Sequence, residues 1–184
     1  MTKLSRRPLL LLAATWPLAT RAQAQTGPFA ALPTLVMPDI DLLEDHPNPA
    51  LAGDNARRVQ AVSQQLREGL AQAGLYRLVD PGPAQPTIDK LRATYAHLYD
   101  CNGCAQTIGI AAGSELVLMG WVQKVSELIL NLNVELREVS SDRVLLNKSV
   151  DLRGNTDESW FRAARYMLRD WSEKRVRNPR YGLP

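Results

Sequence analysis

Two cysteines separated by two residues form the pattern in this sequence that is most suited to chemistry. Cys101 and Cys104 stand in the segment CNGC. A CxxC pair can form a disulfide, exchange with other thiols, or supply two thiolates to a metal. His97 lies four residues before Cys101, so His97, Cys101 and Cys104 form a possible set of three metal ligands. A closed zinc site needs a fourth ligand.

A structural disulfide is the interpretation that we favour for these cysteines. Thioredoxin-like redox sites place a cis-proline downstream of CxxC, whereas this chain has no proline between Pro86 and Pro179. Attachment of a c-type haem needs His directly after the second cysteine, and Ala105 stands there. An oxidising compartment favours pairing of the thiols. Redox exchange and metal binding remain alternatives, and no cofactor is predicted.

Four carboxylates lie within seven residues of a proline-rich stretch: Asp39, Asp41, Glu44 and Asp45. Such oxygen ligands suit calcium. The spacing does not fit the EF-hand loop, however, because Glu44 stands where that loop has glycine. We therefore expect a solvated acidic loop at the end of a strand.

The segment RGNTDESW also concentrates polar residues between a predicted strand and a predicted helix. Arg153, Asn155 and Asp157 are a possible pocket, because loops at strand ends often carry function. Helix capping explains the same residue types, with Asn155 or Thr156 as the cap and an acid in the first turn. We favour capping and keep the pocket as a hypothesis.

Other catalytic patterns do not occur in the chain. It has only two histidines, and it contains no GxSxG, HExxH or phosphate-loop motif. An enzyme is therefore less favoured than a binding protein.

Hydrophobic periodicity predicts the elements that position these residues. Strands are expected near 32–38, 76–80, 115–125, 128–139 and 143–154, and helices near 55–73, 88–98, 104–113 and 157–173. The order β-α-β-α(α)-β-β-β-α predicts an α/β (α+β) domain. It has a single mixed sheet of about five strands, an antiparallel C-terminal meander and helices packed on one face.

The amino terminus has the three parts of a cleaved export signal: basic residues, a short apolar run and the small-residue site Ala22-Gln23-Ala24. The apolar run is too short to span a bilayer and carries two prolines. The segment SRRPLLL also resembles a twin-arginine signal, so export by the Sec or the twin-arginine route is expected. We predict a signal peptide over 1–24, a flexible segment over 25–33, one globular domain over 34–173 and a frayed basic tail over 174–184.

Removal of this leader changes the charge of the protein. The chain has 22 Lys and Arg and 19 Asp and Glu. Four basic residues and no acidic residue leave with the leader, so 18 basic and 19 acidic residues remain and the formal charge becomes −1. Nucleic-acid binding, which needs a basic face, is therefore not expected. The predicted location is periplasmic or secreted, with no transmembrane segment after processing.

The predicted arrangement resembles the amino-terminal domain of TolB and the related core of CsgG-type and penicillin-binding-protein-activator periplasmic proteins. The motifs CxxCA at 101–105, GWVQKVSxLILNLNV at 120–134 and VDLRGNTDESW at 150–160 resemble a bacterial family of predicted secreted proteins of unknown function. This resemblance implies the fold and the periplasmic location, and it assigns no activity.

These observations predict a non-enzymatic periplasmic accessory protein that uses its sheet edge or a helix face to contact another envelope protein. A thiol-redox or metal-handling protein centred on Cys101 and Cys104 is the alternative. The sequence does not specify a ligand.

Overall fold

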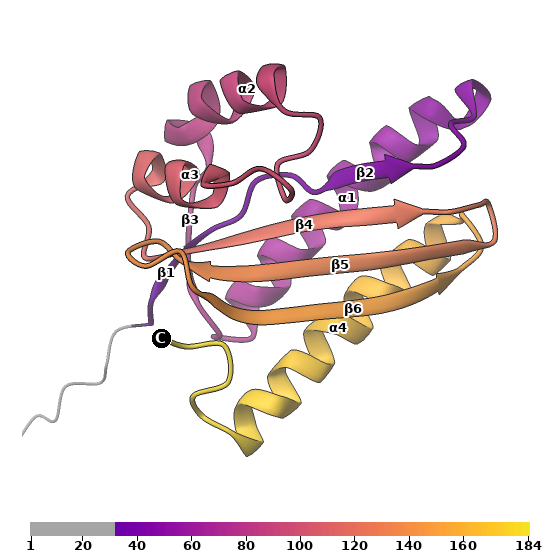
Figure 1. The fold of residues 1–184 in the computed structure, drawn as a ribbon. Helices are drawn as coiled ribbons and strands as arrows, with labels where there is room; N and C mark the ends of the chain where they lie inside the picture. The colour runs from indigo at the N-terminus through magenta and orange to yellow at the C-terminus, as the bar shows by residue number, and fades with distance from the viewer. Residues whose placement is uncertain (1–31) are drawn as a thin grey trace, which may run out of the picture. The chain divides into compact units, whose positions relative to one another are not determined.

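The computed structural model describes residues 32–184, and the predicted signal peptide and most of the segment 25–33 lie outside these residues. Figure 1 shows the fold. The strands are β1 (Thr34–Val36), β2 (Asp41–Glu44), β3 (Arg77–Val79), β4 (Leu116–Lys124), β5 (Ile129–Glu138) and β6 (Val144–Arg153). The helices are α1 (Ala52–Gln72), α2 (Gln85–Thr94), α3 (Cys104–Ala112) and α4 (Asp157–Arg177), with short 3-10 turns at Pro49–Leu51 and Gly82–Ala84. Among residues 32–184, no helix is both long and apolar enough to cross a membrane.

All six strands belong to one mixed sheet, which confirms the predicted fold class. The strand order is β3-β1-β4-β5-β6, in which β3, β1 and β4 are parallel and β4, β5 and β6 form the expected antiparallel meander. The acidic stretch that was expected to be a loop contains β2, which pairs in parallel with the second half of β4. Gly120 permits this approach, because a Cβ there would lie 2.6 Å from Cγ2 of Ile40.

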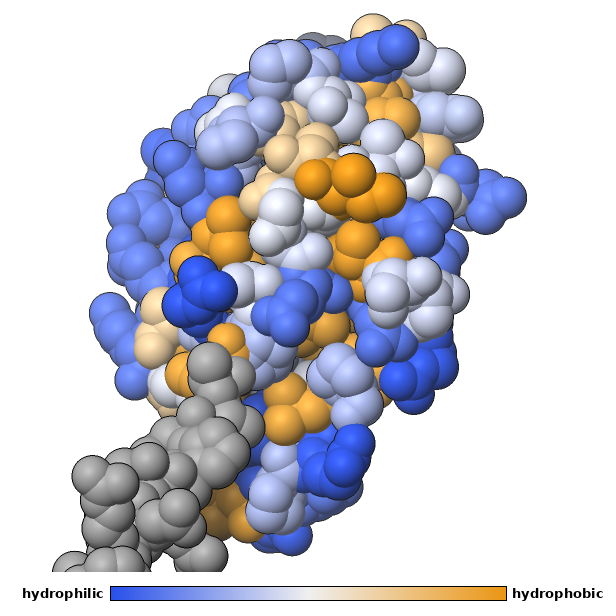
Figure 2. Space-filling view, turned by 90° about the vertical axis from the view of Figure 1, so that its left-hand side faces the viewer, coloured by the Kyte–Doolittle hydropathy of each residue, from blue (hydrophilic) through white to orange (hydrophobic). Residues whose placement is uncertain are grey.

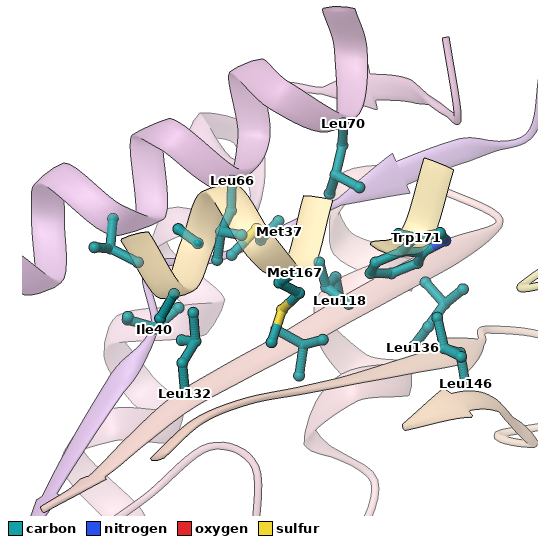
Figure 3. Close-up of a cluster of buried hydrophobic side chains, with 14 of the residues drawn as sticks. Met37, Ile40, Leu66, Leu70, Leu118, Leu132, Leu136, Leu146, Met167 and Trp171 are labelled. Carbon is teal, nitrogen blue, oxygen red and sulfur yellow. The ribbon is translucent and has the colours of Figure 1, made fainter. Parts of the chain in front are cut away.

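The larger hydrophobic core lies between the sheet and the helices α1 and α4. Alternate residues of β5 point into it, as the alternating sequence predicts. Figure 3 shows Leu66 and Leu70 of α1 and Met167 and Trp171 of α4 facing Leu132 and other strand residues. Burial of these long apolar side chains stabilises the packing of both helices on this face.

A second core on the opposite face corrects the expectation that all helices pack on one face. Val117 and Met119 of β4 form one buried cluster with Ile88 of α2 and Ile108 of α3, whereas their neighbours Leu116 and Leu118 belong to the larger core. Because successive strand residues point to opposite faces, β4 is apolar on both faces and both need covering. Figure 1 shows α2 and α3 on one side of the sheet and α1 and α4 on the other.

The C-terminal segment also differs from the expected frayed tail. Helix α4 continues to Arg177, and the side chains of Tyr181 and Leu183 pack against the larger core. The hydroxyl of Tyr76 donates a hydrogen bond to the carbonyl oxygen of Gly182 over 2.7 Å. The tail therefore packs on the domain through its two apolar side chains and is bound to the hydroxyl of the buried Tyr76.

Candidate functional site

A buried lysine lies at the end of β4. The side chain of Lys124 is 1% exposed, and its Nζ atom lies 2.8 Å from Oε1 of Glu44 and 2.5 Å from Oε1 of Glu127. Burial by itself lowers the pKa of Lys124, but the hydrogen bonds to Glu127 and Glu44 outweigh burial, so the pKa is raised above its ordinary value. Hydrogen bonds from Lys124 and Asn155 lower the pKa of Glu127. Lys124 and Glu127 therefore form a charged ion pair at neutral pH.

Asn155 connects this cluster to the two long helices. Its Nδ2 donates to Oε2 of Glu127 over 2.8 Å and to Oδ1 of Asn55 over 2.9 Å. Its Oδ1 accepts from Nε1 of Trp160 over 2.8 Å and from Nη1 of Arg58 over 3.3 Å. All four hydrogen-bonding positions of the amide are used, so Asn155 acts as a structural junction.

Asp157 links the first turn of α4 to α1. Its carboxylate accepts hydrogen bonds from Arg57 over 3.0 and 3.1 Å and from Nε of Arg58 over 2.7 Å. The hydrogen bonds from Arg57 and Arg58 lower the pKa of Asp157 to about 2. Thr156 caps α4, because its side chain accepts from the backbone N–H of Ser159.

We call the set Glu44, Asn55, Arg58, Lys124, Glu127, Asn155 and Asp157 the polar network. Of the three residues predicted to line a pocket, the structure places Asn155 and Asp157 in this network and Arg153 outside it. The sequence analysis did not identify Lys124 as part of a site. The available signal was its position, because Lys124 follows Leu116, Leu118, Gly120 and Val122 on the inward side of a strand. A charged residue whose side chain points to the inward side of a strand requires a buried partner.

The polar network supports an exposed apolar hairpin between β4 and β5. Leu128 is 74% and Ile129 is 58% exposed at this turn. The backbone of the turn is bound to the loop before α4, since Gly154 N donates to Leu128 O and Asn155 N donates to Glu127 O. Beside it lies a hollow of about 660 Å³ lined by residues 128–131 and 151–154. We call Leu128, Ile129 and this hollow the hairpin patch.

The opposite end of the domain has a more ordinary surface. On the side that faces the viewer in Figure 2, hydrophobic residues occur in small groups between hydrophilic ones. Scattered apolar residues of this kind are normal on soluble proteins. We therefore place the candidate binding site at the hairpin patch.

The predicted disulfide between Cys101 and Cys104 is present, with a Cα–Cα distance of 5.4 Å. Cys104 is buried at the first residue of α3, and Cys101 is half-buried in the preceding loop.

The ring of His97 packs against Tyr99, which in turn stacks on Trp121 with a centroid distance of 4.2 Å. Within residues 32–184, no three His, Cys, Asp or Glu side chains are placed to hold a metal ion. The disulfide also removes the thiolates that would ligate one.

The four clustered carboxylates do not converge on a common point. Asp39 binds Arg67 over 2.9 Å, and Asp41 accepts from the backbone N–H of Leu98 over 2.7 Å. Glu44 belongs to the polar network, and the backbone N–H of Asp45 donates to Lys124 O. The side chains of Asp39, Asp41 and Glu44 therefore hold the segment of β2 in place, and each is engaged with a different partner, unlike the calcium site considered from the sequence.

The chain is similar to several solved structures of low sequence identity. The NMR structure of LpoB from E. coli is similar with a TM-score of 0.50 and 14% identity, over 82% of this chain and 84% of LpoB. The lipoprotein GNA1162 from Neisseria meningitidis has a TM-score of 0.47 and 14% identity, over 79% and 97% of the two chains. TolB from Acinetobacter baumannii has a TM-score of 0.44 and 12% identity, over 82% of this chain and 30% of TolB.

These identities are low, so the similarity concerns the fold. No curated protein sequence matches the chain. A family model does match it: DUF3280, described as "Protein of unknown function (DUF2380)", aligns with residues 33–171, which include β1 and most of α4. The chain therefore belongs to the DUF3280 family of proteins of unknown function.

Proposed function

We propose that the protein is a non-enzymatic accessory protein of the periplasm that binds another envelope protein through the hairpin patch. The observation that carries this proposal is the exposure of Leu128 and Ile129 on a hairpin whose Glu127 is bound by Lys124 and Asn155. Exposed apolar side chains beside a hollow are typical of interaction sites. A rigid site also loses little conformational entropy on binding.

The periplasmic location is supported by two features of the chain. The first 24 residues have the composition of an export signal. The Cys101–Cys104 disulfide is a bond that persists in an oxidising compartment.

Photo-crosslinking in cells tests the proposed site. We expect a photoreactive amino acid at position 128 to capture a specific envelope protein, and the same amino acid at position 110 not to capture it. Ile110 is a suitable control because it is 68% exposed on α3, away from the hairpin. The captured protein is then purified and its affinity is measured directly.

The affinity measurement uses matched substitutions. Leu128→Asp and Ile129→Asp are expected to weaken binding by about tenfold or more, because each places a charge in an apolar contact. Ile110→Asp should leave the affinity unchanged. Equal affinities for all three variants would show that the partner binds elsewhere.

Thiol exchange by Cys101 and Cys104 is a second candidate. The observation that favours it is that Cys101 is partly accessible while Cys104 starts a helix, where the helix dipole stabilises a thiolate. If the bond is structural, replacing both cysteines by Ser should lower stability by about 2 kcal/mol, since the loop is short, and leave partner binding intact. Rapid exchange of the native bond with a glutathione buffer would instead support the redox role.

A further inference from the structure

We propose that the free edge of β6 binds an extended peptide segment of the partner as an additional strand, with α4 as the floor beneath it. The segment is expected to alternate apolar residues with polar ones and to carry an acidic residue. This inference rests on the proposed function, namely that the chain binds another protein. It names an adjoining contact surface, which shares residues 151–153 with the hollow of the hairpin patch, and the chemistry of its ligand.

The first argument is the shape of the sheet edge. Strand β6 has ten residues and is the last strand of the sheet, and nothing in the described part of the chain pairs with its outer side. Two hollows follow one another along it. One, of about 370 Å³, is lined by residues 150–153 of β6, and the next, of about 280 Å³, is lined by residues 147–150.

Together these two hollows form the β6 groove. Its β6 wall is the consecutive run of residues 147–153, which spans about 23 Å at the rise of a strand. An ordinary strand has about this length. Strand addition uses the free N–H and C=O groups of such an edge, so affinity comes largely from the backbone.

The second argument is the floor of the β6 groove. The α4 residues that line it are spaced by three or four positions, apart from one adjacent pair: Ser159, Arg162, Ala163, Tyr166, Asp170 and Lys174. They form one stripe of the helix. Figure 1 shows that the C-terminal half of α4 extends past β6. An added strand would therefore lie over α4, with its apolar side chains against the half-exposed ring of Tyr166.

The helix α4 beneath the groove favours a single peptide strand over a second copy of this chain as the ligand. If the β6 edge of a second copy paired here, that copy would bring its own α4 to the same side of the sheet. Two α4 helices that both extend past their sheet edges would compete for one space, because packed helices need about 8–10 Å between their axes. A peptide segment has no such helix and fits the position of one strand.

The third argument is charge. The residues that line the β6 groove include four basic side chains (Lys148, Arg153, Arg162 and Lys174) and two acidic ones (Asp151 and Asp170), for a net charge of +2. Asp170 is bound to Lys148 and Lys174, and Asp151 accepts from Nδ2 of Asn131 over 2.6 Å. Arg162 pairs with Glu158 over 3.3 Å, but both side chains are exposed, and Arg153 has no ion pair among residues 32–184. Arg153 and Arg162 at one end of the groove are therefore the groups best placed to bind a carboxylate of the peptide.

The experiment uses the purified protein and a displayed library of linear peptides of about nine residues, the length of an ordinary strand. We expect selected peptides to share the alternating apolar pattern with an acidic residue. When the best peptide is synthesised and added, backbone amides of residues 144–153 should exchange hydrogen more slowly. The double variant Arg153→Glu/Arg162→Glu should lower its affinity by about tenfold or more. Tyr166→Ala, which removes the exposed ring from the floor, should do the same, and Ile110→Asp should have no effect.

Three results would overturn the inference: a library that gives no binder, a bound peptide that protects residues 125–131 in place of 144–153, or unchanged affinity in the Arg153→Glu/Arg162→Glu variant. None of these results affects the crosslinking from position 128, so the proposed function can stand without the β6 groove. Conversely, if a peptide bound along β6 but position 128 captured no protein, the proposed binding through the hairpin patch would be wrong and the β6 inference would stand.

Discussion

At the scale of single residues, the most consequential feature is the charged Lys124 enclosed between two carboxylates. A buried ion needs partners, because transfer of a charge out of water costs several kcal/mol. Glu44 comes from β2 and Glu127 from the hairpin, so one ammonium group joins two segments that are far apart in the sequence. The hairpin patch depends on this junction for its shape.

Replacement of Lys124 by Met should lower the free energy of unfolding by about 1–3 kcal/mol, because the partly exposed Glu44 and Glu127 would lose their shared charged partner. Chemical denaturation measures this change. The control is Arg162→Ala, which removes an exposed pair with Glu158 and should cost less than about 1 kcal/mol. Equal costs for the two substitutions would mean that the buried cluster does not stabilise the domain.

Asp157 predicts how stability depends on pH. Its pKa is lowered from 3.8 to about 2 in the folded protein by hydrogen bonds from Arg57 and Arg58. A lowered pKa means that the contribution is fully present above pH 4 and is lost as the pH falls toward 2. Wild-type protein should therefore be more stable than Asp157→Asn at pH 6, and the difference should disappear near pH 2. Denaturation curves at several pH values test this, and a constant difference would contradict it.

At the scale of elements, the position of α3 depends on a close approach to the sheet. A Cβ atom at Gly109 would overlap the methyl groups of Val117 and Val139. Only glycine leaves room for β4 at this point, so the second core needs this residue. The disulfide and the stacked rings of Tyr99 and Trp121 then hold the loop that leads into α3.

Gly109→Ala should destabilise the protein by about 1–3 kcal/mol, since the added methyl group overpacks a tight contact. Gly53→Ala is the matched control, because Gly53 is also helical and a Cβ there meets no atom within 4 Å. That control should be neutral or stabilise the protein by up to about 1 kcal/mol. Thermal or chemical unfolding of both variants measures the difference. A Gly109→Ala variant as stable as the control would show that α3 can move away from the sheet.

At the scale of the whole domain, the C-terminal segment closes the larger core. Tyr76 lies against Trp171 with a centroid distance of 5.8 Å, and Arg175 donates to its hydroxyl over 2.9 Å. Residues 178–184 cover this ring. The segment thus belongs to the fold, and the domain described here extends to residue 184.

Deletion of residues 179–184 should expose Tyr76 and change its titration. Burial raises the pKa of this phenol to about 12, so its contribution to stability is present below pH 10 and is lost as the pH rises through 12. Absorbance titration of the intact protein should show a tyrosine that ionises near 12. In the shortened protein this pKa should move toward 10. An unchanged titration would mean that the tail does not shield the ring.

The sequence by itself determined the elements and their order. Alternation along β5, the helical period of α1 and α4, and the capping residues of RGNTDESW are local signals, and each predicted the observed structure. The CxxC spacing also predicted the disulfide, because two residues between cysteines bring their Cα atoms close enough. The strand β2 was missed, since its four residues are too few to show a period.

Only the tertiary structure decided which residues meet. The polar network joins β2, α1, the β4–β5 hairpin and α4, and no local pattern links Glu44 to Lys124 or Asn55 to Asn155. The division of helices between two faces likewise follows from the apolar character of β4 on both sides. The β6 groove exists because α4 extends past the last strand. Contacts between distant segments depend on how the elements pack in three dimensions, and that packing turned scattered polar and apolar residues into candidate sites.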